Sequence, residues 1–106
     1  MVELRIGLIV ILGAVLTGCM SGHEVVVHQE FLEPGQHANV HVDCPDGMKV
    51  FGGGFNIETP EEVEIFESSP SDGSGNTIDN GWNLFVHNIG TQKRQATVSA
   101  VCAKIK

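Results

Sequence analysis

Histidine is the side chain of this sequence best suited to hold a metal ion, and there are five of them. His37 and His41 fall on one face of a predicted strand, but the extended chain between them spans about 13 Å. One ion with ligand bonds of about 2.1 Å cannot join both directly. His28 or His87 could approach one of the two only if the fold allows it. We therefore expect polar surface histidines and no metal site.

Carboxylates are densest between positions 58 and 67, at Glu58, Glu61, Glu62, Glu64 and Glu67. Paired carboxylates can perform acid–base chemistry where a pocket separates their pKa values. Here Glu62 and Glu64 alternate with Val63 and Ile65, which is typical of the solvated face of a strand. A solvated face is therefore the simplest interpretation. An electrostatic docking surface is the alternative, with Glu61, Glu62 and Glu64 as its candidate binding residues.

Oxygen-bearing side chains also recur at spacings faintly like those of a calcium loop, at Asp72, Ser74, Asn76 and Asp79. Thr77 stands where such a loop requires glycine, and Asn83 stands where it requires a bidentate glutamate. We therefore expect a solvated loop whose side chains satisfy its own backbone.

The remaining motifs give no support for catalysis or phosphate binding. The sequence has no GxSxG elbow, and Ser68-Ser69 has no base linked to it by a motif. The run Gly52–Gly54 is followed by Phe55-Asn56-Ile57, not by the helix start of a phosphate loop. Glycines within a strand often allow the close approach of a large neighbour. We predict that Trp82, the single tryptophan, lies across Gly52 or Gly54, and we expect no enzyme and no cofactor.

The elements that must position these residues follow an apolar start. Residues 6–16 form an apolar run that suits a signal-peptide core and is shorter than the roughly 20 residues of a membrane-spanning helix. Leu16-Thr17-Gly18-Cys19 then resembles the lipobox of bacterial lipoproteins. The resemblance implies cleavage before Cys19, a diacylglycerol and acyl lipid on its thiol, and a membrane-anchored, extracytoplasmic protein. With Met20 next, it implies the outer membrane in a Gram-negative host. A buried helix or an uncleaved anchor is the alternative.

Three cysteines leave one over in an exported chain. A lipidated Cys19 accounts for it, so Cys44 and Cys102 remain as a pair for a disulfide in an oxidising compartment. Two buried free thiols are the alternative. The domain boundaries that follow are 1–18 for the lipoprotein signal peptide, 19–24 for a lipidated tether and 25–106 for a β domain.

Residue patterns in the β domain predict strands almost throughout. Ala38, Val40, Val42 and Cys44 alternate with polar residues, so residues 37–44 form the clearest strand. Further strands are predicted at 24–32, 48–57, 62–68, 81–89 and 95–105, with a loop between positions 69 and 80. The predicted fold class is all-β, a small antiparallel sandwich or barrel of about six strands with one disulfide.

The motifs of this domain also resemble a family of small secreted bacterial domains with the pattern CPxG, GGGF, SxP, GW and a closing cysteine. The matching segments are Cys44-Pro45-Asp46-Gly47, Gly52-Gly53-Gly54-Phe55, Ser69-Pro70, Gly81-Trp82 and Ala100-Val101-Cys102-Ala103. The resemblance implies a disulfide-closed β domain and names no ligand.

The chain has 106 residues and a formal charge of −7, which disfavours nucleic-acid binding because such binding needs a basic surface. We expect a lipid-anchored, non-catalytic binding or interaction module of the cell envelope, with an unknown protein or glycan ligand. One alternative is an acidic lipoprotein that inhibits a basic hydrolase such as lysozyme. Another is a phage- or plasmid-borne lipoprotein that masks a receptor.

Overall fold

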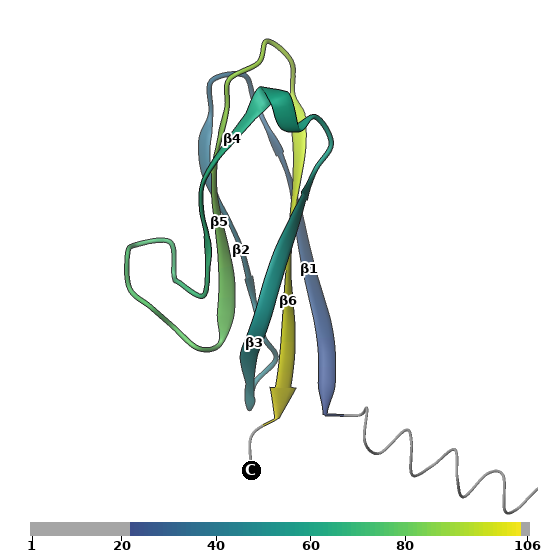
Figure 1. The fold of residues 1–106 in the computed structure, drawn as a ribbon, viewed down its shortest axis with the longest axis vertical. Helices are drawn as coiled ribbons and strands as arrows, with labels where there is room; N and C mark the ends of the chain where they lie inside the picture. The colour runs from purple at the N-terminus through teal and green to yellow at the C-terminus, as the bar shows by residue number, and fades with distance from the viewer. Residues whose placement is uncertain (1–21, 105–106) are drawn as a thin grey trace, which may run out of the picture.

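A computed structural model describes residues 22–104 as six β-strands and one short 3₁₀ turn (Figure 1). The elements are β1 (His23–Leu32), β2 (His37–Asp43), β3 (Met48–Ile57), η1 (Pro60–Glu62), β4 (Val63–Ser69), β5 (Gly81–Asn88) and β6 (Arg94–Lys104). All six strands expected from the sequence are confirmed to within about one residue at each end. Because β1 begins at His23, two residues assigned above to the tether, His23 and Glu24, lie in this strand. Cys19 and the lipobox-like segment lie outside the described residues.

The strands form two antiparallel sheets of three strands each. Sheet A has the order β1-β6-β3, and sheet B has the order β2-β5-β4. Figure 1 shows the two sheets side by side, with β4 joined to β5 by a long loop that projects from the side of sheet B. The predicted choice between sandwich and barrel is thus resolved as a sandwich.

The core lies between the sheets because each strand turns alternate side chains inward. In sheet A the strand β6 contributes small residues, and Ala96, Val98 and Ala100 are fully buried. In sheet B the larger Leu84 and Val86 face them. Small residues on one sheet opposite larger ones on the other let the two layers pack closely.

Trp82 packs across the core onto the glycine run of β3. A Cβ atom placed on Gly53 would lie 2.1 Å from Cδ2 of Trp82, so only glycine fits there. The predicted contact is therefore present, but the prediction of Gly52 or Gly54 is wrong. The reason is a β-bulge between Val50 and Gly52, which shifts the alternation by one residue and turns Gly53 inward.

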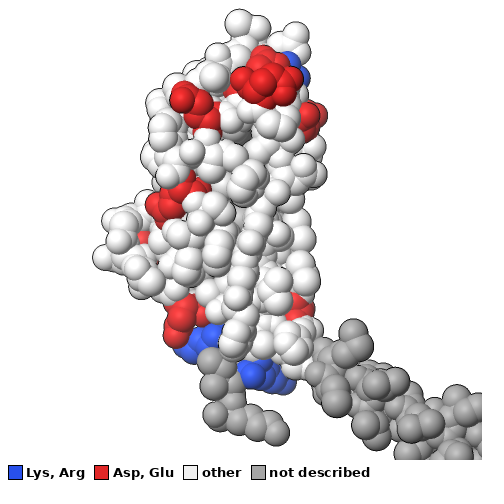
Figure 2. All heavy atoms as spheres, viewed as in Figure 1, with Lys and Arg blue, Asp and Glu red and all other residues white. Residues whose placement is uncertain are grey.

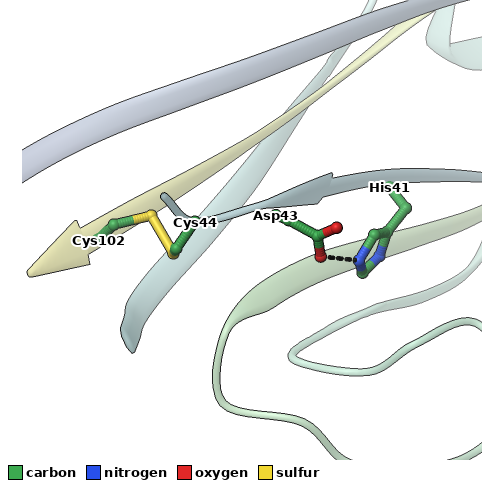
Figure 3. The surroundings of a disulfide bond; sticks show 4 residues. All are labelled: His41, Asp43, Cys44 and Cys102. Carbon is green, nitrogen blue, oxygen red and sulfur yellow. Dashed lines mark hydrogen bonds and ion pairs between the residues drawn. A yellow bond between two sulfur atoms is a disulfide. The ribbon is translucent and has the colours of Figure 1, made fainter. Parts of the chain in front are cut away.

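The disulfide Cys44–Cys102 is confirmed, with the two Cα atoms 5.7 Å apart. Cys44 follows β2 of sheet B and Cys102 lies in β6 of sheet A, so the bond joins the two sheets (Figure 3). The start of β1 and the end of β6 lie at the same end of the sandwich (Figure 1). We call this the disulfide end and the opposite one, which carries η1, the η1 end.

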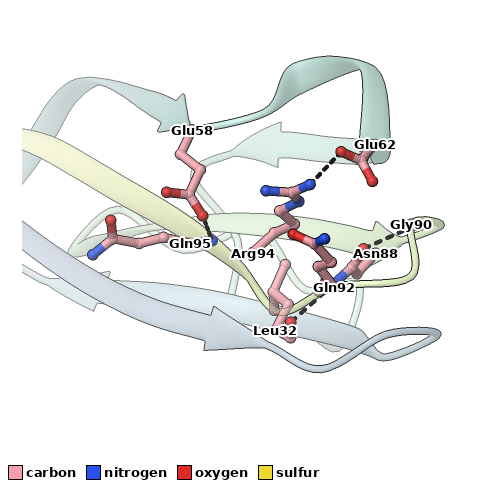
Figure 4. A network of polar contacts seen from close by, with 8 residues as sticks. All are labelled: Leu32, Glu58, Glu62, Asn88, Gly90, Gln92, Arg94 and Gln95. Carbon is pink, nitrogen blue, oxygen red and sulfur yellow. Dashed lines mark hydrogen bonds and ion pairs between the residues drawn. The ribbon is translucent and has the colours of Figure 1, made fainter.

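At the η1 end, the buried Asn88 holds three chain segments together (Figure 4). Its side-chain amide donates to the carbonyl oxygens of Leu32, at 3.0 Å, and Gln92, at 2.8 Å. Its Oδ1 accepts a hydrogen bond from the backbone N–H of Gly90 at 2.9 Å. A single side chain thus satisfies backbone groups of β1 and of the loop between β5 and β6.

Candidate functional site

The outer face of sheet B carries a row of side chains that could meet a ligand. The strand register places His37 opposite His87 and His87 opposite Glu64, so the three residues share one row on one face. The rings of His37 and His87 stack with centroids 3.7 Å apart and planes 11° apart. Nδ1 of His87 lies 3.6 Å from a carboxylate oxygen of Glu64. His87 thus does approach His37, the condition left open by the sequence.

Two phenylalanines extend this row into a larger surface. Phe66 and Phe85 lie with ring centroids 5.5 Å apart, and Phe66 is 6.5 Å from His87. We call His37, Phe66, Phe85 and His87 the aromatic–histidine cluster. Phe66 is 56% exposed, so the cluster presents ring surface to solvent.

Two features of the chain produce the cluster. Alternation along β5 turns Phe85 and His87 outward while Leu84 and Val86 face the core. A bulge between Ile65 and Glu67 places Phe66 outside the regular pairing of β4. The alternation could have been read from the sequence, but neither the bulge nor the pairing of β2 with β5 leaves a local signal.

The histidines do not form a metal centre as they are placed. Within residues 22–104, no group of three or more His, Cys, Asp or Glu is arranged to hold a metal ion. Nε2 of His41 instead bonds to a carboxylate oxygen of Asp43 at 2.8 Å, next to the disulfide (Figure 3).

A polar layer separates the cluster from the long loop after β4. The Glu67 carboxylate accepts hydrogen bonds from the hydroxyls of Ser71 and Ser69, the latter at 2.7 Å. These bonds favour the charged form and lower the pKa of Glu67, the Ser71 hydroxyl most strongly. Beside it, the fully buried Asn83 donates to Oδ1 of Asn39 at 2.8 Å.

The loop between β4 and β5 is held by its own side chains, as the sequence predicts. The Asp72 carboxylate accepts from the backbone N–H of Ser74 at 2.8 Å and from the side-chain amide of Asn76 at 3.1 Å. The Ser74 backbone bond, followed by the Asn76 side chain, lowers the pKa of Asp72. Asp72 thus caps its own turn, which is the behaviour of an ordinary Asx-type loop.

The structure assigns separate partners to the acidic stretch. Glu62 forms an ion pair with Arg94, and its side chain is only 30% exposed (Figure 4). The Glu58 carboxylate accepts from the backbone N–H of Gln95 at 3.1 Å. Glu61 is exposed on η1, and the Glu64 side chain is 53% exposed beside His87. Figure 2 shows carboxylates at the η1 end and others along the side of the molecule and near the disulfide end. Of the three predicted binding residues, Glu61 and Glu64 are therefore open to a partner.

Comparison with models of known families, with curated proteins and with solved structures finds no match for this chain. The resemblance to the CPxG…GGGF…GW family therefore stays a prediction, as does the lipobox. Among the described residues, no helix has the length and apolar character needed to cross a bilayer.

Proposed function

We propose that this protein is a lipid-anchored, extracytoplasmic binding module of the cell envelope that does no catalysis. The observation that carries the proposal is the lipobox-like Leu16-Thr17-Gly18-Cys19, which ends only four residues before the first strand at His23. The disulfide supports it, because such bonds persist in oxidising compartments and are rare in the cytosol. In this scheme Cys19 becomes the lipidated first residue of the mature chain, and the outer membrane is its destination in a Gram-negative host.

The anchor is tested by feeding labelled palmitate to cells that express the full chain. We expect the native chain to carry the label and to be found in the membrane fraction. Cys19→Ala should carry no label and should leave the membrane fraction. Ser21→Ala, two residues away, is the matched control and should keep the label. Equal labelling of the native chain and Cys19→Ala would refute the anchor.

The aromatic–histidine cluster is the surface that we propose for ligand binding. Exposed rings offer flat apolar faces that can stack against a sugar ring or a side chain of a partner protein. Glu64 beside the cluster adds a hydrogen-bond acceptor that can fix orientation. The combination suits a protein or glycan ligand better than a small molecule enclosed in a cavity.

The cluster is tested by affinity capture from envelope extracts with the full-length lipidated protein in detergent, followed by identification of what is retained. Phe66→Ala should lose the captured ligand, because the Phe66 ring is 56% exposed within the cluster. Phe31→Ala is the matched control, since Phe31 is 61% exposed but lies on sheet A. Equal capture by both variants would contradict the assignment of the site.

Inhibition of a basic hydrolase is the second candidate function, favoured by the open carboxylates of Glu61 and Glu64 at the η1 end. Carboxylates there would steer a cationic enzyme, so binding should weaken as salt is added. Lysozyme serves as the probe. We expect weaker inhibition by Glu61→Gln and Glu64→Gln but not by Glu24→Gln at the disulfide end. No inhibition by the native protein at low salt would exclude this function.

A further inference from the structure

The outer face of sheet A has an unusual polarity along β1. The pairing with β6 turns Glu24, Val26, His28, Glu30 and the fully buried Leu32 toward the inner side of the sheet. The residues that point outward are His23, Val25, Val27, Gln29 and Phe31. Of these, Val25 is 63% exposed and Val27 is 60% exposed. A strand of a sandwich normally shows the reverse arrangement, with apolar residues inside and polar residues outside.

The same face carries no negative charge within the described strands, although the chain has a net charge of −7. The register places Val101 of β6 between Val25 of β1 and Gly52 of β3. Ser99 likewise lies between Val27 and Gly54 in the next row. The register also turns Lys49, Asn56, Gln95, Thr97 and Ala103 outward, and Phe51, in the bulge of β3, is 64% exposed. Glu24 and Glu30 of β1 point to the inner side of the sheet, and other carboxylates lie in loops at its borders, on Glu33, Glu58 and Asp79.

The glycines make this face flat. A Cβ atom on Gly52 would meet nothing within 4 Å, and one on Gly54 would meet only the Ser99 hydroxyl at 3.5 Å. Packing therefore does not demand glycine at either position, in contrast to Gly53. Because Gly52 and Gly54 have no side chains, little protrudes from β3 at these two positions, which lie in the same rows as Val25 and Val27 of β1.

This face lies close to the proposed lipid. The backbone carbonyl of Gly22 accepts a hydrogen bond from the backbone N–H of Lys104, at 3.2 Å, so the chain is fixed to the sheet from that residue on. From Cys19 to Gly22 the chain can reach at most about 11 Å when fully extended. An acylated Cys19 would therefore hold Val25, Val27 and Val101 within a short distance of the bilayer surface.

We propose that the outer face of sheet A, at its disulfide end, rests on the surface of the membrane. The inference rests on the proposed lipid anchor and extends it, because it names the surface that meets the lipid. Val25, Val27 and Val101 would enter the interfacial region, where apolar side chains are stabilised, and none of the outward-facing strand residues is a carboxylate that anionic headgroups would repel. The aromatic–histidine cluster, on the opposite sheet, then faces away from the bilayer.

A second copy of the chain is the competing occupant. β1 is an edge strand of sheet A, and two copies could pair through it only if no side chain obstructed its unpaired edge. The His28 and Glu30 side chains are bonded to each other at 3.0 Å and turn toward the inner side of β1. Polar and charged residues that point inward on an edge strand oppose such pairing.

The experiment uses the lipidated full-length protein reconstituted in phosphatidylethanolamine–phosphatidylglycerol vesicles that contain brominated lipid. Val27→Trp places a fluorophore on the outer face of sheet A, in the same row as Ser99 and Gly54. Phe66→Trp is the matched control on sheet B, since Phe66 is similarly exposed. We expect Val27→Trp to lose most of its added emission and Phe66→Trp to lose none, relative to native Trp82.

Charge reversal sharpens the test. In the Val27→Trp background, Val25→Glu should restore emission because a carboxylate is repelled by the anionic lipid, while Val25→Lys should keep the quenching. Equal quenching of Val27→Trp and Phe66→Trp, or none in either while the protein stays vesicle-bound, would overturn the membrane face. A concentration-dependent dimer with unquenched Val27→Trp would assign the face to a second copy.

The lipid anchor is tested separately in the same experiment, by flotation of the protein with the vesicles. If Cys19→Ala floats with the vesicles as well as the native protein does, the lipid anchor fails. If only the native protein floats but Val27→Trp is not quenched, the anchor stands and the proposed membrane face is rejected.

Discussion

The two ends of the sandwich are closed by different chemistry. At the disulfide end a covalent bond joins sheet A to sheet B through Cys44 and Cys102. At the η1 end the closure is made by hydrogen bonds of Asn88 and by the ion pair of Glu62 with Arg94. The first closure acts mainly by restricting the unfolded chain, whereas the second exists only in the folded one.

This difference changes how the acidic residues of the η1 end are to be interpreted. Glu62 sits at the η1 end as part of its closure, since its backbone carbonyl also accepts from Ile89 at 2.9 Å. Removing its charge would therefore perturb structure as well as any binding. Among the described contacts, Glu61 and Glu64 make none that closes the η1 end. They are therefore the residues with which to test electrostatic binding.

The largest effect is expected from breaking the covalent closure. Cys44→Ala/Cys102→Ala frees a loop of 58 residues and should lower the free energy of unfolding by about 4 kcal/mol. Urea denaturation of the native protein and the variant measures the difference. Reductant should destabilise the native protein and leave the variant unchanged. Equal midpoints for both proteins would show that the bond contributes little.

Next in size is the contact of Trp82 with β3, nearer to the disulfide end. Gly53→Ala should cost roughly 1–3 kcal/mol, because the new Cβ would overlap the indole ring and force it to move. Gly52→Ala is the matched control, since its Cβ would meet open space. Thermal unfolding followed by tryptophan fluorescence compares the two. Similar midpoints would mean that the ring yields without cost.

The closure of the η1 end is tested by Asn88→Ala. Loss of its side chain leaves two carbonyl oxygens and one N–H without their partner, at a cost of about 1–3 kcal/mol. Hydrogen exchange should accelerate in the loop between β5 and β6 before it changes in β3. Uniform acceleration over all strands would show that the two ends do not open independently. Asn76→Ala, in an exposed loop, should have little effect.

The smallest effect is a pH dependence that belongs to the loop region after β4. The pKa of Glu67 is lowered from its ordinary value of 4.5, so the unfolded chain binds more protons than the folded one just below that pH. The stability from Glu67 is thus present above pH 4.5 and is lost as pH falls through the lowered pKa. Urea midpoints measured in this acidic range should fall less steeply in Glu67→Gln. An unchanged slope would contradict the role of the two serine hydroxyls.

Much of the fold could be predicted from the sequence because alternation is a local signal. The strand at 37–43 follows directly from it, and assigning Cys19 to the lipobox-like motif leaves Cys44 and Cys102 as a pair. The stack of His37 on His87 could not be predicted, because it depends on which strands become neighbours. The prediction that Trp82 packs on Gly52 or Gly54 failed for a different reason. The bulge between Val50 and Gly52 reverses the alternation that the prediction assumed.

The position of the disulfide has a mechanical consequence for an anchored protein. A ligand held on sheet B and pulled away from the envelope would transmit tension to the lipid through Gly22 and β1. The bridge from Cys102 to Cys44 lies at the end where that tension would enter, and it connects sheet A, which begins nearest to the proposed anchor, to sheet B, which carries the proposed binding surface. Peeling of the two layers would therefore be opposed at the end where it would start.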